Sequence, residues 1–259
     1  MSERLIEVGN GFWNIRGDFR IGGVLNIGTQ ASLVRRADGR FLMLDGYTLR
    51  GELLQQVREL TDDGALLDAI IHLHPFHTVH VQAAHAQFPG AKLYGTCRHH
   101  ERFPDLPWQA ERSESPECAA LFAGELEFSV PEGVVFVSPN ENLHFSSVLA
   151  WHPASKTIHS DDTLMVLRAP GPLGRLLPPA VRFHMTLAQT LERRAGAAGA
   201  FRTWASGLAT RWGAAENLCA AHTGTLLARE NRGDGIADRI RGALRATQKT
   251  HDKHQRRLG

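Results

Sequence analysis

The chain contains 259 residues, 42% of them hydrophobic and 22% charged, and its formal net charge is +2. This is the composition of a globular protein with a large core, and so small a charge gives no global argument for a nucleic-acid or membrane partner. No apolar run is long enough to span a membrane, the N-terminus lacks a signal-peptide pattern, and the three cysteines have no disulfide or zinc-knuckle spacing. We therefore expect a cytoplasmic protein with reduced thiols.

The first part of the chain is predicted to be β-structure followed by a strand–helix–strand unit. Within residues 5–45, the sequence Ala-Asp-Gly at 37–39 predicts a hairpin turn between two strands. Apolar residues at helical spacing predict an amphipathic helix over 49–61. A short apolar strand over 66–71 follows the helix. This order favours a parallel pair of strands joined by a crossover helix.

The strand over 66–71 ends in a cluster of histidines. Side chains two residues apart share a face of a strand, so His72 and His74 are expected to project together from its end. Pro75 then turns the chain, and His77 is expected at the start of a helix that continues over 78–88. Imidazoles that converge at a strand end are typical of a zinc-type metal site.

The rest of the chain alternates predicted strands and helices. Strands are expected over residues 91–95, 125–130, 133–137, 145–151, 156–159 and 217–221. Helices are expected over 186–212, with a break near 196–199, and over 235–247. Loops are predicted over 98–118 and 168–182. In the first of these loops, His99 and His100 are expected to face solvent, with contact to a substrate as the alternative.

The last eleven residues, 249–259, are basic and contain histidine. Such a segment could contact an acidic partner, but short charged termini are usually solvated and frayed. We therefore expect a flexible tail.

The polar residues that fall at predicted strand ends come from five segments: Asp45, His72, His74, His77, His144, Asp162 and His222. Over roughly residues 10–230 this arrangement resembles the metallo-β-lactamase superfamily. The superfamily motif His-x-His-x-Asp-His is matched by residues 72–77 except at one position. Asp45-Gly46 is similar to the Asp-Thr-Gly turn of the superfamily, and residues 144–164 resemble its third-histidine segment followed by Gly-Asp-Thr-Leu.

The resemblance implies an α/β fold in a single domain over 1–259. The implied architecture is a four-layer αββα sandwich of two mixed β-sheets, with helices outside and metal at one edge of the sheets. It implies one zinc site made by His72, His74 and His144, and a second made by His77, Asp162 and His222. Asp162 would bridge the two sites. It is preferred to Asp161 because it directly precedes Thr163-Leu164. Asp45 would support the site from behind the ligands.

The sequence departs from the superfamily pattern at Phe76, where the motif has an aspartate that binds the second metal. Phenylalanine cannot bind a metal or orient water. Three interpretations follow: two metals with the second bound more weakly, one metal in the three-histidine site or with Asp162 as a fourth ligand, or loss of catalysis. The loop at His144 also departs from the usual Gly-His-Thr.

The leading hypothesis is a metal-dependent hydrolase that uses a metal-bound hydroxide on a small ester, thioester, lactone or phosphoester. Asp162, His77 or the metal hydroxide itself would take the role of base, and Phe76 would line the pocket. The cofactor is expected to be one or two zinc ions, with iron or manganese as alternatives. We expect a small-molecule substrate and neither a nucleic-acid nor a membrane partner. The first alternative is a non-catalytic metal-binding or regulatory protein of the same fold, and an iron redox protein ranks last.

Overall fold

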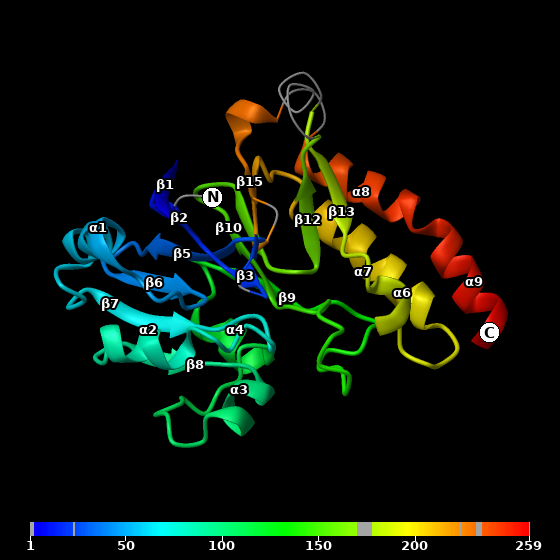
Figure 1. The fold of residues 1–259 in the computed structure, drawn as a ribbon. Coiled ribbons are helices and arrows are strands. Elements are labelled where there is room, and N and C mark those ends of the chain that lie inside the picture. The colour runs from blue at the N-terminus through cyan, green and yellow to red at the C-terminus, as the bar shows by residue number, and fades with distance from the viewer. Residues whose placement is uncertain (1–2, 23, 170–177, 223, 232–234, 259) are drawn as a thin grey trace. The chain divides into compact units, whose positions relative to one another are not determined.

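The computed structural model describes residues 3–22, 24–169, 178–222, 224–231 and 235–258. Its contacts divide the chain into two compact units. Unit 1 contains residues 1–128 and 152–155, and unit 2 contains residues 129–151 and 156–259. Each unit has its own mixed β-sheet and its own helices, which Figure 1 shows. No helix in the described ranges combines the length and the apolar character that a bilayer crossing requires.

The main sheet of unit 1 has six strands in the order β1-β2-β5-β6-β7-β8. The strands are β1 (Arg4–Gly9), β2 (Phe12–Gly17), β5 (Thr29–Arg35), β6 (Phe41–Leu44), β7 (Leu67–Ile71) and β8 (Lys92–Tyr94). A separate two-stranded sheet pairs β3 (Arg20–Ile21) with β4 (Leu25–Asn26). The helices of this unit are α1 (Gly51–Thr61), α2 (Val81–Gln87), α3 (Cys97–Arg102) and α4 (Pro116–Leu121).

The predicted hairpin and crossover in unit 1 are confirmed. Strands β5 and β6 pair antiparallel, and Gly39 in the turn between them has a φ of +87° that favours glycine. Strands β6 and β7 pair parallel, and α1 connects them. Leu53 and Val57 of α1 are buried in the core of unit 1. Because β6 and β7 are parallel, both end at the same edge of the sheet.

The main sheet of unit 2 has five strands in the order β15-β14-β11-β10-β9. The strands are β9 (Glu127–Ser129), where the chain passes from unit 1 into unit 2, β10 (Leu149–His152), β11 (Thr157–Ser160), β14 (Asn217–Ala220) and β15 (Gly224–Leu226). A separate hairpin pairs β12 (Leu164–Leu167) with β13 (Ala180–Phe183).

The helices of unit 2 are α6 (Leu187–Thr190), α7 (Ala197–Arg211), the 3-10 helix η1 (Ala228–Glu230), α8 (Ile236–Ala246) and α9 (Gln248–Leu258). Helix α8 packs against α7 and β13, and it buries Ile236 and Ile240 while Leu244 is partly buried. The helical segment predicted over 186–212 is interrupted, as expected, but the interruption covers residues 191–196, and residues 197–199, where it was expected, already belong to α7. The two large mixed sheets with their helices confirm the predicted α/β class.

Several element predictions were wrong. The helix expected from 78 begins at Val81, because residues 75–80 form turns. The loop predicted over 98–118 contains most of α3 and the first residues of α4. Residues 133–137 contain only an isolated bridge between Val134 and Leu191 instead of a strand. Residues 145–148 precede the strand that was expected to include them.

Two further differences lie in unit 2. The loop predicted over 168–182 gives way to β13 at Ala180, while its residues 170–177 lie outside the described part of the chain. The tail expected over 249–259 is helical: α9 continues to Leu258, and its His251 is fully buried. A buried side chain on one face holds the helix on unit 2, which the basic composition of this segment does not reveal.

Candidate metal centre

In unit 1, Asp45 follows strand β6 and lies beside the histidine loop that follows β7. The Leu73 backbone N–H donates a hydrogen bond of 2.9 Å to Asp45 Oδ1, and the carboxylate is buried. Asp45 has a φ of +57°, a left-handed conformation that aspartate tolerates better than most residues. The aspartate therefore holds the backbone between His72 and His74.

His72 lies in the interior of unit 1. Its ring centroid is 5.1 Å from that of His99 and 5.9 Å from that of Trp108. Among the described residues, neither ring nitrogen of His72 has a hydrogen-bond partner. Burial lowers the pKa of His72 to about 4, although the Asp45 charge opposes the shift. The imidazole is therefore neutral at pH 7. This neutral buried ring has one nitrogen lone pair without a hydrogen-bond partner among the described residues, and a metal ion would satisfy that lone pair.

His74 and His77 form a stacked pair in the loop after β7. Their ring centroids are 4.1 Å apart and their planes differ by 19°. The His77 backbone N–H donates to the His74 carbonyl at 3.0 Å, which closes the turn that brings the rings together. The Phe76 N–H donates to His74 Nδ1 at 3.1 Å. A metal ion would therefore bind the His74 ring at Nε2 after Nε2 loses its proton, or at Nδ1 after displacing the Phe76 N–H.

Phe76, which the sequence resemblance aligns with the motif aspartate, contacts a cation. The guanidinium carbon of Arg98, on α3, lies 4.6 Å from the centroid of the Phe76 ring, a cation–π contact. This loop therefore has an apolar ring and a positive charge where the superfamily motif has a negative charge. Both features disfavour a second metal ion at this position.

His99 is the residue of unit 1 that the sequence analysis misjudged most. It is fully buried instead of facing solvent. Its Nδ1 accepts a hydrogen bond of 3.1 Å from the Thr96 N–H and lies 2.9 Å from the Thr96 hydroxyl, so it caps the start of α3. Burial lowers its pKa well below the ordinary value. His100 is half-buried and stacks on Trp108, with ring centroids 5.2 Å apart.

In unit 2, the structure brings two of the predicted ligands together. Strands β11 and β14 are parallel, and Ser160 is paired with Ala220 at their ends. Asp162 and His222 each lie two residues beyond this last pair, at the same edge of the sheet. His222 Nε2 is 3.3 Å from Asp162 Oδ1. Parallel pairing therefore explains why residues sixty positions apart in the sequence meet.

The second aspartate of this turn, Asp161, has a histidine neighbour of its own. His159 Nε2 is 3.8 Å from Asp161 Oδ1, and both side chains are fully buried. The sequence carries no signal for His159, because alternation along a strand alone does not show which histidine meets a carboxylate. Asp162, in contrast, contacts the predicted ligand His222.

His144 lies in a loop that hydrogen bonds hold in place. Its Nε2 contacts the Glu141 carbonyl, and because a carbonyl can only accept, Nε2 is the donor in this contact. The Thr186 hydroxyl donates to the His144 carbonyl at 3.1 Å and lies 2.8 Å from His184 Nδ1. His184 was missed by the sequence analysis, because it follows a strand that was predicted as loop.

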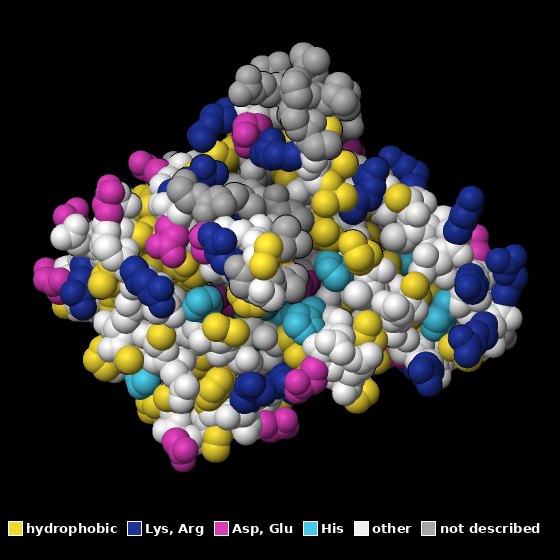
Figure 2. Space-filling model, viewed as in Figure 1, with side chains coloured by type: hydrophobic (Ala, Val, Ile, Leu, Met, Phe, Trp, Pro, Cys, Tyr) yellow, Lys and Arg dark blue, Asp and Glu magenta, His cyan; other side chains and the backbone are white. Residues whose placement is uncertain are grey.

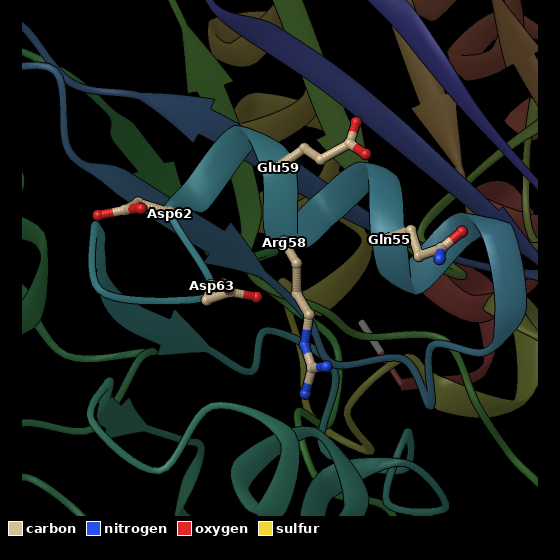
Figure 3. Close-up of a pocket in the computed structure, with 5 residues that line it drawn as sticks. All are labelled: Gln55, Arg58, Glu59, Asp62 and Asp63. Carbon is tan, nitrogen blue, oxygen red and sulfur yellow. The ribbon is translucent and has the colours of Figure 1, made fainter.

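A separate pocket at the end of α1 is unrelated to these histidines. It is lined by Gln55, Arg58, Glu59, Asp62 and Asp63. Figure 3 shows that these side chains point in different directions and do not converge on a common centre. Hydrated charges of both signs without convergence do not form a metal or substrate site.

The sequence matches no protein-family model and no curated protein. The structure, however, is similar to solved metallo-β-lactamases. It matches FIM-1 from Pseudomonas aeruginosa in its mono-zinc form with a TM-score of 0.62 and 12% identity, covering 97% of both chains. It matches DIM-1 exposed to ceftazidime with a TM-score of 0.61 and 14% identity, covering 96% of this chain and 99% of the other. It matches a metallo-β-lactamase from Erythrobacter litoralis with a TM-score of 0.61 and 12% identity, covering 95% of this chain and 96% of the other.

These likenesses cover nearly the whole chain and show that it has the metallo-β-lactamase fold, as the sequence predicted. Each unit supplies imidazole nitrogens and carboxylate oxygens at the ends of its strands. Imidazole and carboxylate together suit zinc, iron and manganese, so the residues present fit a metal of this group.

Proposed function

We propose that this protein is a metal-dependent hydrolase. The proposal is carried by the contact between Asp162 and His222 at the ends of parallel strands, a carboxylate–imidazole pair in a chain with the metallo-β-lactamase fold. The stacked His74 and His77 in unit 1 support it.

We propose the ligand sets that the sequence predicts. His72, His74 and His144 would hold a first zinc ion, and His77, Asp162 and His222 a second, with Asp162 as the bridge. The assignment rests on the order of these residues in the sequence and on the contacts within each unit. Iron or manganese would suit the same donors.

A bound divalent metal of this kind lowers the pKa of its water to about 7 and polarises the bond to be cleaved. Asp162 would orient the attacking water and accept its proton, with His77 as the alternative base. Phe76 would form an apolar wall of the pocket and exclude water beside the reacting group. The substrate would be a small ester, thioester, lactone or phosphoester. The protein would act in the cytoplasm, where Cys97, Cys118 and Cys219, which form no disulfide, would stay reduced.

The number of ions is set by the loss of the motif aspartate. Because Phe76 offers no ligand and Arg98 lies over its ring, we propose that the second ion binds more weakly than the first. FIM-1, which has a similar structure, was crystallised in a mono-zinc form. A single ion would therefore be compatible with this fold.

A second candidate is that the protein is a non-catalytic member of the fold. The contact between Phe76 and Arg98 favours this alternative. The Phe76–Arg98 pair is a stable packing arrangement that replaces an acidic ligand with a cation. A protein of this kind would use the scaffold for binding or regulation. If it keeps the metal site, it would bind metal without hydrolysing these substrates; if it has lost the site, it would take up no first-row metal even when incubated with zinc.

The test is a hydrolysis screen with neutral esters, thioesters, lactones and phosphodiesters, before and after removal of metal with a chelator. We expect chelation to abolish the activity, zinc to restore it, and His74→Ala to lower it strongly. His85→Ala, at a histidine outside the ligand set, is the matched control and should keep the activity. Full activity of metal-free protein would contradict a metal-dependent mechanism.

A further inference from the structure

Helix α9 turns a row of cationic side chains to solvent. Lys249, Lys253 and Arg256 are exposed, at intervals of four and three residues that place side chains on one helix face. Arg245, one turn earlier at the end of α8, is exposed too. The buried His251 lies about 200° around the axis from Lys249, because each residue turns a helix by about 100°. The four cations, here called the basic stripe, therefore point away from unit 2.

No carboxylate in the described part of the chain forms an ion pair with the basic stripe. The two aspartates of these helices are engaged elsewhere. Asp252 accepts a hydrogen bond of 2.7 Å from the Gln248 side chain, and Asp238 pairs with Arg241 at 2.8 Å. The basic stripe therefore has its full charge available for an external anion.

The charge of the chain is concentrated in this region. Residues 236–258 contain seven lysines and arginines against two aspartates, a net charge of +5. The whole chain has a net charge of +2, so the other residues together carry −3. Figure 2 shows the lysine and arginine side chains gathered over α8 and α9. A local charge of this size attracts anions even though the chain as a whole is nearly neutral.

The surface around the basic stripe is polar. The large hydrophobic side chains that are exposed among the described residues lie on other elements: Val24, Val79, Leu121, Leu167 and Met185. A helix that inserts into a lipid interface needs an apolar face beside its cations, and α9 lacks one because its exposed positions are Gln, Lys and Arg. The features of this face therefore match a hydrophilic polyanion better than a membrane.

We propose that the basic stripe binds the phosphate backbone of a nucleic acid without reading its sequence, which reverses the expectation drawn from the net charge of the whole chain. Lys249 and Arg256 are seven residues apart on α9, about 10 Å along the helix at about 1.5 Å per residue, and Arg245 precedes Lys249 by four residues at the end of α8. A DNA strand carries one negative charge for about every 3.4 Å of its axis, so a phosphate can lie near each of the four cations. Lysine meets a phosphate as a point charge and arginine as a bidentate donor. This inference is independent of the metal centre.

The test measures binding of the full-length protein to a fluorescein-labelled DNA duplex of about 20 base pairs and to the RNA duplex of the same sequence, by anisotropy between about 50 and 200 mM KCl. The variant Lys249→Gln/Lys253→Gln/Arg256→Gln is compared with wild type. The control, Arg4→Gln/Arg58→Gln/Lys92→Gln, removes the same charge from exposed positions of unit 1. A second variant, Lys249→Ala/Lys253→Ala, replaces the lysines with the best helix former, so α9 is kept.

We expect wild type to bind at least one duplex, with an affinity that falls as salt rises. At about 100 mM KCl the triple variant should bind at least about tenfold more weakly, and the slope of log K against log salt should fall by about 2 to 3. The alanine pair should lower the slope by about 2, and the control should stay within about twofold of wild type. No binding of wild type to either duplex, or equal losses in the triple variant and the control, would overturn the proposal. So would binding to phosphatidylserine vesicles alone, which would assign the stripe to a membrane surface.

Discussion

Asp162 Oδ1 and His222 Nε2 lie 3.3 Å apart, at the ends of two parallel strands that the sequence separates by almost sixty residues. The contact depends on the register of β11 and β14, which pairs Ser160 with Ala220. Two residues beyond this pair, one strand is followed by a carboxylate and the other by an imidazole, and both groups are ligands for divalent metals. The geometry within unit 2 thus gives the proposed metal centre its most direct support.

The first prediction concerns this pair. Asp162→Asn and His222→Ala should each lower the affinity for the second metal ion by more than about 100-fold. Loss of a residue that only hydrogen-bonds to a ligand lowers metal affinity by roughly 10–100-fold, and here the ligand atom itself is removed. Zinc titration with a chromophoric chelator measures the change. Asp161→Asn is the matched control, since its carboxylate faces His159. If Asp161→Asn loses metal and Asp162→Asn does not, the assignment of the bridging aspartate is wrong.

The second prediction restores the motif aspartate. Phe76→Asp should strengthen binding of the second metal, because it returns an anionic ligand to the loop. Arg98 would pair with the new carboxylate and reduce the gain, since its guanidinium lies 4.6 Å from the present ring. The double variant Phe76→Asp/Arg98→Gln should therefore bind more tightly than the single one. Phe76→Leu is the control without a charge, and equal metal affinity in all three would refute this explanation.

The third prediction concerns the space beside His72. A Cβ on Gly46 would lie 2.7 Å from His72 Cε1 and 2.8 Å from the Cβ of Ala84. Gly46→Ala should therefore lower the free energy of unfolding by about 1–3 kcal/mol, the usual cost of overpacking a core. A Cβ on Gly90 would meet nothing within 4 Å, so Gly90→Ala should change stability by less than about 0.5 kcal/mol. Urea denaturation compares them, and two equally stable variants would disprove the packing seen here.

The fourth prediction is a pH dependence that arises from His251. Burial, with a smaller contribution from the charge of Arg202, lowers the pKa of this histidine to about 4. Between about pH 4 and 6.5 the unfolded chain therefore binds a proton that the folded chain does not, so the free energy of unfolding falls as the pH falls. The stabilisation is fully present above about pH 6.5, and its loss at pH 4 should be on the order of 1–3 kcal/mol.

His251→Leu should flatten this pH dependence, and urea denaturation of both proteins at several pH values measures it. Burial also lowers the pKa values of His72 and His152 to about 4, so the informative quantity is the difference between wild type and variant. Identical pH profiles would show that the pKa of His251 is the same in the folded and unfolded states, which would contradict the prediction.

The parts of the fold that sequence patterns predicted are those with strong local signals. The alternation of β6, α1 and β7 follows from hydrophobic spacing and a hairpin turn, and the structure confirms it. Asp162 and His222, which lie 3.3 Å apart, were assigned to one metal site because both follow apolar strands in an order that resembles a known superfamily.

The remaining features depend on contacts that no local pattern reveals. Helix α9 is so polar that its one buried residue, His251, gives no hydrophobic period. His99 was expected in a loop, yet its ring accepts a hydrogen bond from the Thr96 N–H and caps the start of α3. This interaction forms only once the backbone of the helix is in place, so the sequence alone does not reveal it. His184 reaches the His144 loop through Thr186, across a separation of forty residues in the sequence.

The most direct test of the central claim is the metal content of protein purified without a chelator, measured by elemental analysis. The account predicts one to two equivalents of zinc, iron or manganese per chain, with less metal in the Asp162→Asn and His222→Ala variants. A protein that contains no first-row metal, and takes up none on incubation with zinc, would contradict a metal-dependent hydrolase and leave the non-catalytic alternative.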